Sequence, residues 1–173
     1  MSEICSKFPV TFTQRNMLSL SYAVNNSGLN IEQLICRSSE PFTEERLNFA
    51  FQSLLTQFPE LTCSYNLDEN YNWTQRYNTS LEIKTTWKDW SSFSPEECDS
   101  RFNKWLAKDR SAGFKIDKNE LLNRITAFQF SNEKFIWVWT IHHALIDGRS
   151  LIKYLEHFFN SIDDENFIAS NQN

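Results

Sequence analysis

Two adjacent histidines, His142 and His143, precede an Asp–Gly pair, Asp147 and Gly148, in the segment HHALIDG. The chain has three histidines in all. A histidine side chain has an ordinary pKa near neutral pH, so it can accept a proton from a hydroxyl or an amine. A carboxylate in the following turn could hold the ring in one tautomer. These residue types at this spacing therefore make the segment a candidate general-base site.

The backbone around the histidines argues against a metal site. They end the run FIWVWTIHH, whose aromatic and β-branched residues predict a β-strand. Consecutive side chains of a strand point to opposite faces, so His142 and His143 cannot both bind one metal ion. The cysteines show no ligand spacing, so we expect neither zinc nor a disulfide framework at Cys5, Cys36, Cys63 and Cys98.

A structural interpretation fits the same residues. A buried histidine can be hydrogen-bonded to the backbone, and Asp147 can cap a helix that begins after it. From the residue types alone, this interpretation and the catalytic one are equally well supported.

The elements that position the segment are a strand before it and a helix after it. The runs LLNRITAFQF and FIWVWTIHH flank the polar SNEK and predict an antiparallel hairpin. In RSLIKYLEHFFNSI, a helix behind a Ser150 cap would bury an apolar face. That predicted face consists of Leu151, Ile152, Leu155, Phe158, Phe159 and Ile162.

Other segments show equally clear patterns. Thr43 can cap a helix that ends at Pro59, and Ser94 with Glu97 forms a capping box for a second helix through SPEECDSRFNKWLAKD. Strands are predicted in LNIEQLICRS, LTCSYNL and SLEIKTTW. The sequence therefore predicts an α+β fold with a mostly antiparallel sheet and about three helices.

Charge and hydropathy bear on partners and location. The net charge is -5 and no basic cluster is present, so we expect no nucleic-acid partner. The longest apolar stretch falls far short of the ~20 residues of a membrane span, and the N-terminus lacks the apolar core of a secretory signal. We therefore predict a cytoplasmic protein in which residues 1–173 form a single domain without an internal linker.

The segment His142-His143-Ala-Leu-Ile-Asp147-Gly148 resembles the HHxxxDG motif of the condensation-domain superfamily. That superfamily includes the condensation domains of nonribosomal peptide synthetases, related free-standing acyltransferases and, more distantly, chloramphenicol acetyltransferase. The likeness extends to PVTFTQRNML, FTEERLNFAFQSLLTQFPEL and DRSAGFKIDKNELLNR, and so covers nearly the whole chain.

The resemblance implies an acyltransferase with a chloramphenicol acetyltransferase-like lobe. His143 would face a substrate tunnel and accept a proton from an amine or alcohol that attacks a thioester. The donor would be acyl-coenzyme A or a phosphopantetheinyl carrier protein, with no tightly bound cofactor and no metal. His142 would be structural, Asp147 would support the loop through an arginine, and Gly148 would allow tight packing where the helix begins.

The resemblance also predicts what completes the lobe. Family members commonly carry an arginine where this chain has Asn123, which leaves Arg124 or another residue as the partner of Asp147. Condensation domains have two lobes in roughly twice this length, so residues 1–173 correspond to the N-terminal lobe. We expect a second lobe or a homo-oligomer to complete the site. The alternative is a noncatalytic half-domain that binds a carrier protein, an acyl chain or a partner subunit.

Overall fold

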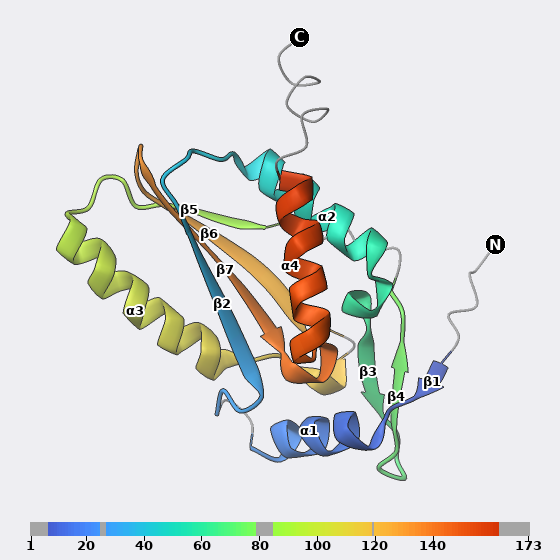
Figure 1. Ribbon diagram of the computed structural model, residues 1–173. Helices are drawn as coiled ribbons and strands as arrows, with labels where there is room; N and C mark the ends of the chain where they lie inside the picture. The colour runs from blue at the N-terminus through green and yellow to red at the C-terminus, as the bar shows by residue number, and fades with distance from the viewer. Residues whose placement is uncertain (1–6, 25–26, 79–84, 119, 163–173) are drawn as a thin grey trace.

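A four-stranded sheet forms the centre of the molecule in the computed structural model, which describes residues 7–24, 27–78, 85–118 and 120–162 (Figure 1). Its strand order is β2-β7-β6-β5. The strands are β2 (Ile31–Ser38), β7 (Lys134–His142), β6 (Asn123–Ser131) and β5 (Thr86–Asp89). The fold is α+β, as predicted.

The pairing in this sheet is antiparallel except at one edge. β6 and β7 form the predicted hairpin, and β2 pairs antiparallel with β7 so that Ile31 lies opposite His142. β5 pairs with β6 in parallel, and the helix α3 (Pro95–Ala112) makes the connection between them. A parallel pair needs such a crossover because the chain must return to the starting end of the sheet.

Helices cover both faces of the large sheet (Figure 1). α3 lies on one face, and α2 (Glu44–Gln57) and α4 (Gly148–Ile162) lie side by side on the other. Strand alternation divides the core accordingly. The cluster that includes Phe102 of α3 contains Phe128, Phe130, Ile136 and Val138, whereas the larger cluster contains Ile125, Ala127, Trp137, Trp139 and Ile141.

The predicted helix starts at Thr43 and Ser94 are confirmed. The Thr43 hydroxyl accepts the Arg46 N–H, and Ser94 and Glu97 form the complete capping box. For α4 the predicted buried face is partly wrong. Tyr154 and Phe158 are its buried residues, whereas Ile152 and Phe159 are 60% and 42% exposed.

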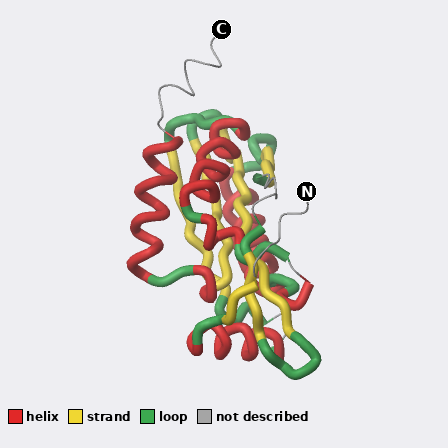
Figure 2. The backbone as a smooth tube through the Cα atoms, turned by 90° about the vertical axis from the view of Figure 1, so that its right-hand side faces the viewer, coloured by secondary structure: helices red, strands yellow, loops and turns green. Residues whose placement is uncertain are grey.

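A smaller sheet and a fourth α-helix lie at the end of the large sheet where β7 finishes (Figures 1 and 2). The small sheet has the order β1-β4-β3, with β3 in the predicted LTCSYNL segment. Its strands are β1 (Lys7–Pro9), β4 (Trp73–Arg76) and β3 (Ser64–Leu67). The predicted strand SLEIKTTW is found only as β5, because residues 79–84 lie outside the described part of the chain.

The sequence patterns did not predict this fourth helix, α1 (Phe12–Ala23). Only Leu18 is fully buried along it, so it lacks the apolar stripe by which helices are recognised. Its start nevertheless has a local signature, since Thr11 and Gln14 form a capping box. Three 3₁₀ turns complete the described chain: η1 (Pro59–Thr62), η2 (Ile116–Lys118) and η3 (His143–Leu145).

Candidate functional site

The HHALIDG segment lies where β7 ends and the chain turns through η3 into α4. His142 is the last residue of β7, and its N–H donates to the Leu122 carbonyl at 2.8 Å. His143 is the first residue of η3, and its N–H donates in the other direction, to the Asn30 carbonyl at 2.8 Å. The main chain therefore holds the two histidines from opposite sides, from the residue before β6 and from the residue before β2.

His142 is fully buried. Its Nδ1 accepts the Ala144 N–H at 3.1 Å, and its Nε2 lies 3.0 Å from the Ser21 hydroxyl of α1. Since Nδ1 accepts, the neutral ring carries its proton on Nε2 and donates to Ser21. Burial, with a smaller effect from neighbouring His143, lowers the pKa of His142 from 6.5 to about 4. The ring is thus neutral and fixed in one tautomer.

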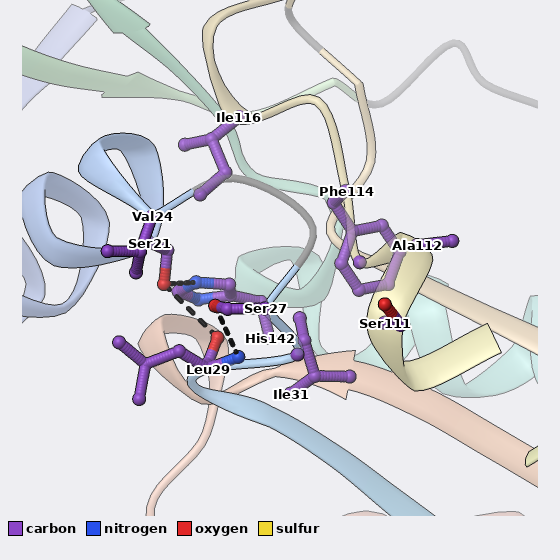
Figure 3. A pocket seen from close by; sticks show the side chains of 12 residues that line it. Ser21, Val24, Ser27, Leu29, Ile31, Ser111, Ala112, Phe114, Ile116 and His142 are labelled. Carbon is purple, nitrogen blue, oxygen red and sulfur yellow. Dashed lines mark hydrogen bonds between the residues drawn. The ribbon is translucent and has the colours of Figure 1, made fainter. Parts of the chain in front are cut away.

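A small pocket borders His142 on the side of α1 (Figure 3). Its walls come from the end of α1, the start of β2 and the end of α3, and include Ser21, Leu29, Ile31 and Phe114. The Ser21 hydroxyl also donates to the Leu29 carbonyl at 3.2 Å. His143 is not among the residues that line this pocket, which therefore belongs to the scaffold around His142.

His143 differs from His142 in both burial and bonding. Its side chain is half-buried, and its Nδ1 is a buried atom without a hydrogen-bond partner among the described residues. Buried ring nitrogens are normally hydrogen-bonded, so an unpartnered one calls for an explanation. A substrate or an additional protein surface could approach only the remaining, exposed part of the ring.

The residue after His143 is held on the side of α1 and the small sheet. The Ala144 carbonyl accepts from Gln14 Nε2 at 3.2 Å and from the Tyr65 hydroxyl at 3.4 Å. Gln14 at the same time accepts the Thr11 N–H through Oε1 as part of the helix cap. α1 therefore contacts the turn on both sides of His143, through Ser21 before it and Gln14 after it.

Asp147 caps α4. Its Oδ1 accepts the N–H groups of Arg149 at 2.9 Å and Ser150 at 2.8 Å, and its side chain is exposed. The hydrogen bonds from Ser150 lower the pKa of Asp147 below its usual value. The prediction that Ser150 caps this helix is therefore wrong by three residues. The capping role that the structural interpretation assigned to Asp147 matches these contacts.

Gly148 does not have the packing role expected of it. A Cβ built on Gly148 would meet no atom within 4 Å among the described residues, and its φ is not positive. The expected tight packing at the start of the helix is thus wrong. The start of α4 is capped by Asp147, and a residue with a side chain would fit at position 148 without a clash among the described residues.

Arg124 does not pair with Asp147. Its guanidinium donates to both Asp109 Oδ1 at 2.9 Å and the Gly113 carbonyl at 2.8 Å, at the end of α3. The expectation that Arg124 supports the motif through Asp147 is therefore wrong. The reason is strand alternation: Arg124 points to the α3 face, and Asn123, one position earlier, points to the opposite one.

Asn123 is buried at 3% exposure and joins two core elements. Its Nδ2 donates to the Leu61 carbonyl at 2.7 Å, and its Oδ1 accepts from Trp139 Nε1 at 3.4 Å. The position at which the resemblance expects an arginine is therefore filled by a neutral amide with its own partners.

Sequence reasoning missed Ser21 and Asn30, which connect α1 to both histidines. Asn30 has a φ of 58°, and its Nδ2 donates to the Met17 carbonyl at 3.1 Å and to the Ser21 hydroxyl at 2.9 Å. The available signal was the turn-type run SGLN before β2, since asparagine is enriched at positive φ. Nothing in that run indicates that its carbonyl meets His143.

Neither a metal-binding cluster nor a membrane-spanning helix is present among the described residues. No group of three or more His, Cys, Asp and Glu side chains gathers there in a way that could hold a metal ion. Within the same residues, no helix combines the length and the apolar character required to span a bilayer. Cys36, Cys63 and Cys98 are thiols, and Cys5 lies outside the described residues.

Comparison with protein families gives a match to the condensation domain over residues 5–165. Among curated proteins, a linear gramicidin synthase polypeptide of Brevibacillus parabrevis is 26% identical over 151 residues, which are 87% of this chain and 3% of the synthase polypeptide. A plipastatin synthase polypeptide of Bacillus subtilis (strain 168) is 30% identical over 85 residues, which are 49% of this chain and 3% of that polypeptide. The chain thus spans a small part of these relatives.

Two solved structures show the fold. The starter condensation domain of rhizomide synthetase RzmA matches with a TM-score of 0.78 and 11% identity, covering 90% of this chain and 38% of that one. The first condensation domain of the calcium-dependent antibiotic synthetase, in complex with a substrate analogue, matches with a TM-score of 0.74 and 16% identity, covering 88% and 36%. These matches correspond to the N-terminal lobe of a condensation domain.

Proposed function

The chain belongs to the condensation-domain family, and from this membership we propose that it forms the motif-bearing lobe of a thioester-dependent acyltransferase. An amine or hydroxyl of the acceptor attacks the thioester carbonyl of the donor. The new C–N or C–O bond forms, the C–S bond breaks, and His143 passes the acceptor's proton to the departing thiolate. The donor is acyl-coenzyme A or an acyl group on a carrier-protein pantetheine.

The difference between the two histidines carries this proposal. His142 is neutral, buried and bonded through both ring nitrogens, so it has no free nitrogen for chemistry. His143 is half-buried beside it, and its Nδ1 has no hydrogen-bond partner among the described residues. A general base must have an unoccupied nitrogen that a substrate can reach. Of the pair, only His143 is partly exposed and has a ring nitrogen without a hydrogen-bond partner among the described residues.

We propose further that a second lobe or a second copy of the chain completes the site. The chain covers 38% and 36% of the two condensation-domain structures it matches. The half-buried side chain of His143 supports the same idea, because a surface that packs against its exposed part would enclose the ring. The partners are thus the donor, the acceptor and this completing surface.

Thiol release tests the proposal. The chain is incubated with octanoyl-coenzyme A and leucine N-acetylcysteamine thioester, and free coenzyme A is measured while light scattering gives the mass of the assembly. We expect acceptor-dependent release that falls by about 10²–10⁴-fold in His143→Ala. His157→Ala is the matched control, because His157 bonds to Ser53 between α2 and α4. Release that is equal in His143→Ala and His157→Ala would refute the catalytic role.

A noncatalytic half-domain is the second candidate. It is favoured by the share of the family domain that the chain covers and by the absence of an arginine pair at Asp147 among the described contacts. Such a lobe would bind a carrier protein, an acyl chain or a partner subunit. Saturable binding of octanoyl-coenzyme A without any thiol release, at concentrations where the chain is associated, would favour this candidate over the enzyme.

A further inference from the structure

We infer that Asn30, with Ser21, is the positioning residue that holds His143 in place, an inference that rests on the proposed role of His143. The side chain of His143 has no hydrogen bond among the described residues to orient it. Its position is therefore set by its main chain, and the Asn30 carbonyl is the acceptor for its N–H. A residue that fixes this carbonyl therefore also fixes the backbone position from which the His143 side chain extends.

The Asn30 carbonyl is fixed by two kinds of constraint. Its φ of 58° lies in the left-handed region, which turns the chain sharply just before β2 begins at Ile31. Its side-chain amide donates both of its hydrogens to α1, one to the Met17 carbonyl and one to the Ser21 hydroxyl. Asn30 therefore ties α1, the start of β2 and His143 together through three hydrogen bonds.

Ser21 extends the arrangement to the other histidine. Its hydroxyl has one proton, which it donates to the Leu29 carbonyl at 3.2 Å. It must then accept from both Asn30 Nδ2 and His142 Nε2, which agrees with the tautomer that the Ala144 N–H independently requires of His142. The two histidines thus share one support, in which His142 is a rigid neighbour and the Asn30 carbonyl is the anchor for His143.

The residues that hold His143 in place are different from the residue that would accept the substrate proton. Neither Ser21 nor His142 has a free nitrogen or oxygen to accept a substrate proton, because the Ser21 hydroxyl and both ring nitrogens of His142 are already hydrogen-bonded. The side chain of Asn30 is a neutral amide, which is not a base. A misplacement of a reacting group by about 1 Å can cost about 100-fold in rate. Loosening Asn30 should therefore lower turnover while binding of the thioester is unchanged.

The test uses Asn30→Gly, Asn30→Asp and Ser21→Ala. Glycine keeps the positive φ without the side chain, aspartate keeps the shape without the amide donors, and alanine removes the shared hydroxyl. Ser21→Thr restores a hydroxyl and is the rescue variant. Ser19→Ala is the matched control, since Ser19 lies on the same helix and accepts only from Trp73 Nε1 at 2.9 Å among the described contacts.

The first readout needs no turnover. Amide exchange of the His143 N–H and the three-bond couplings that report its χ1 rotamer are measured by NMR on the full chain. We expect exchange about five- to tenfold faster, with rotamer averaging, in Asn30→Gly, Asn30→Asp and Ser21→Ala, and wild-type values in Ser21→Thr and Ser19→Ala. A single His143 rotamer with unchanged exchange in all variants would overturn the inference.

The second readout is the thiol-release assay with the same probe thioesters. We expect kcat to fall about tenfold or more with KM unchanged in the loosened variants, and to recover in Ser21→Thr. If His143→Ala lowers turnover but these variants do not, the positioning role is wrong and the function stands. If His143→Ala has no effect, the proposed function is wrong, and the NMR result still decides whether Asn30 orders His143.

Discussion

Arg124 Nη2 lies 2.8 Å from Asp109 Oδ1, and this ion pair joins β6 to the last turn of α3. The two side chains are 31% and 10% exposed. Asp109 also accepts from the Thr140 hydroxyl at 2.7 Å and from Gln33 Nε2 at 2.9 Å. The carboxylate is thus a shared acceptor for β2, β6 and β7, on the face of the sheet opposite α2 and α4.

Breaking this ion pair should cost more than breaking an exposed one. We expect Arg124→Met to lower the free energy of unfolding by about 2–3 kcal/mol, because it leaves a largely buried Asp109 without its cation. The control is Lys134→Met, whose pair with Asp99 spans 3.5 Å with side chains 48% and 64% exposed; its effect should stay within about 1 kcal/mol. Urea denaturation at pH 7 measures both, and equal losses would contradict the prediction.

Asp147 should tolerate replacement by another capping residue. Asp147→Ala removes the acceptor for the Arg149 and Ser150 N–H groups, so the melting temperature should fall by about 2–4 °C. Asp147→Asn keeps a capping oxygen and should stay near the wild-type value. Calorimetry at pH 7 distinguishes the roles, because a residue that needed an arginine partner would lose as much stability with asparagine as with alanine.

The depressed pKa of His142 makes stability depend on pH. The unfolded ring titrates near 6.5 and the folded ring near 4, so the unfolded state binds more protons between these values. Its contribution is present above pH 6.5 and is lost as the pH falls toward 4. From pH 7 to pH 5 the expected loss is about 2 kcal/mol.

His142→Gln is the comparison for this pH dependence, because glutamine does not titrate. We expect the variant to be less stable at pH 7 and to show a smaller decline in the free energy of unfolding between pH 7 and pH 5. Urea denaturation at half-unit pH intervals gives the two curves. Parallel curves would assign the decline to other groups and contradict the neutral, buried state of His142.

Asn123 should be intolerant of both apolar and charged replacements. Asn123→Leu leaves the Leu61 carbonyl and the Trp139 N–H without partners, and each unsatisfied group costs about 1–3 kcal/mol. Asn123→Arg would place a charge at a site with 3% exposure and should destabilise at least as strongly. Chemical denaturation measures both. A stable Asn123→Arg protein would mean that the arginine of the family motif finds a partner such as Asp147 after all.

Much of the fold could be predicted from local patterns. Thr43, Ser94 and Glu97 start their helices as predicted because caps depend on residues within one turn. The β6–β7 hairpin follows from two apolar runs around a polar turn. α1 was not predicted, because its one fully buried residue, Leu18, makes no periodic apolar pattern. The reason is that this helix packs across the end of the sheet rather than on its face.

The sequence by itself determined the chemical types at the site and the strand that leads into it, because the aromatic and β-branched run before His142 is a local pattern. Strand alternation could not give the direction of His143, because β7 ends at His142 and His143 begins η3. Only the tertiary structure decided their partners. Ser21 and His142 are 121 positions apart, and Arg124 reaches Asp109 because strand alternation turns it toward α3 rather than toward Asp147. Such contacts depend on how whole elements pack, which no local pattern encodes.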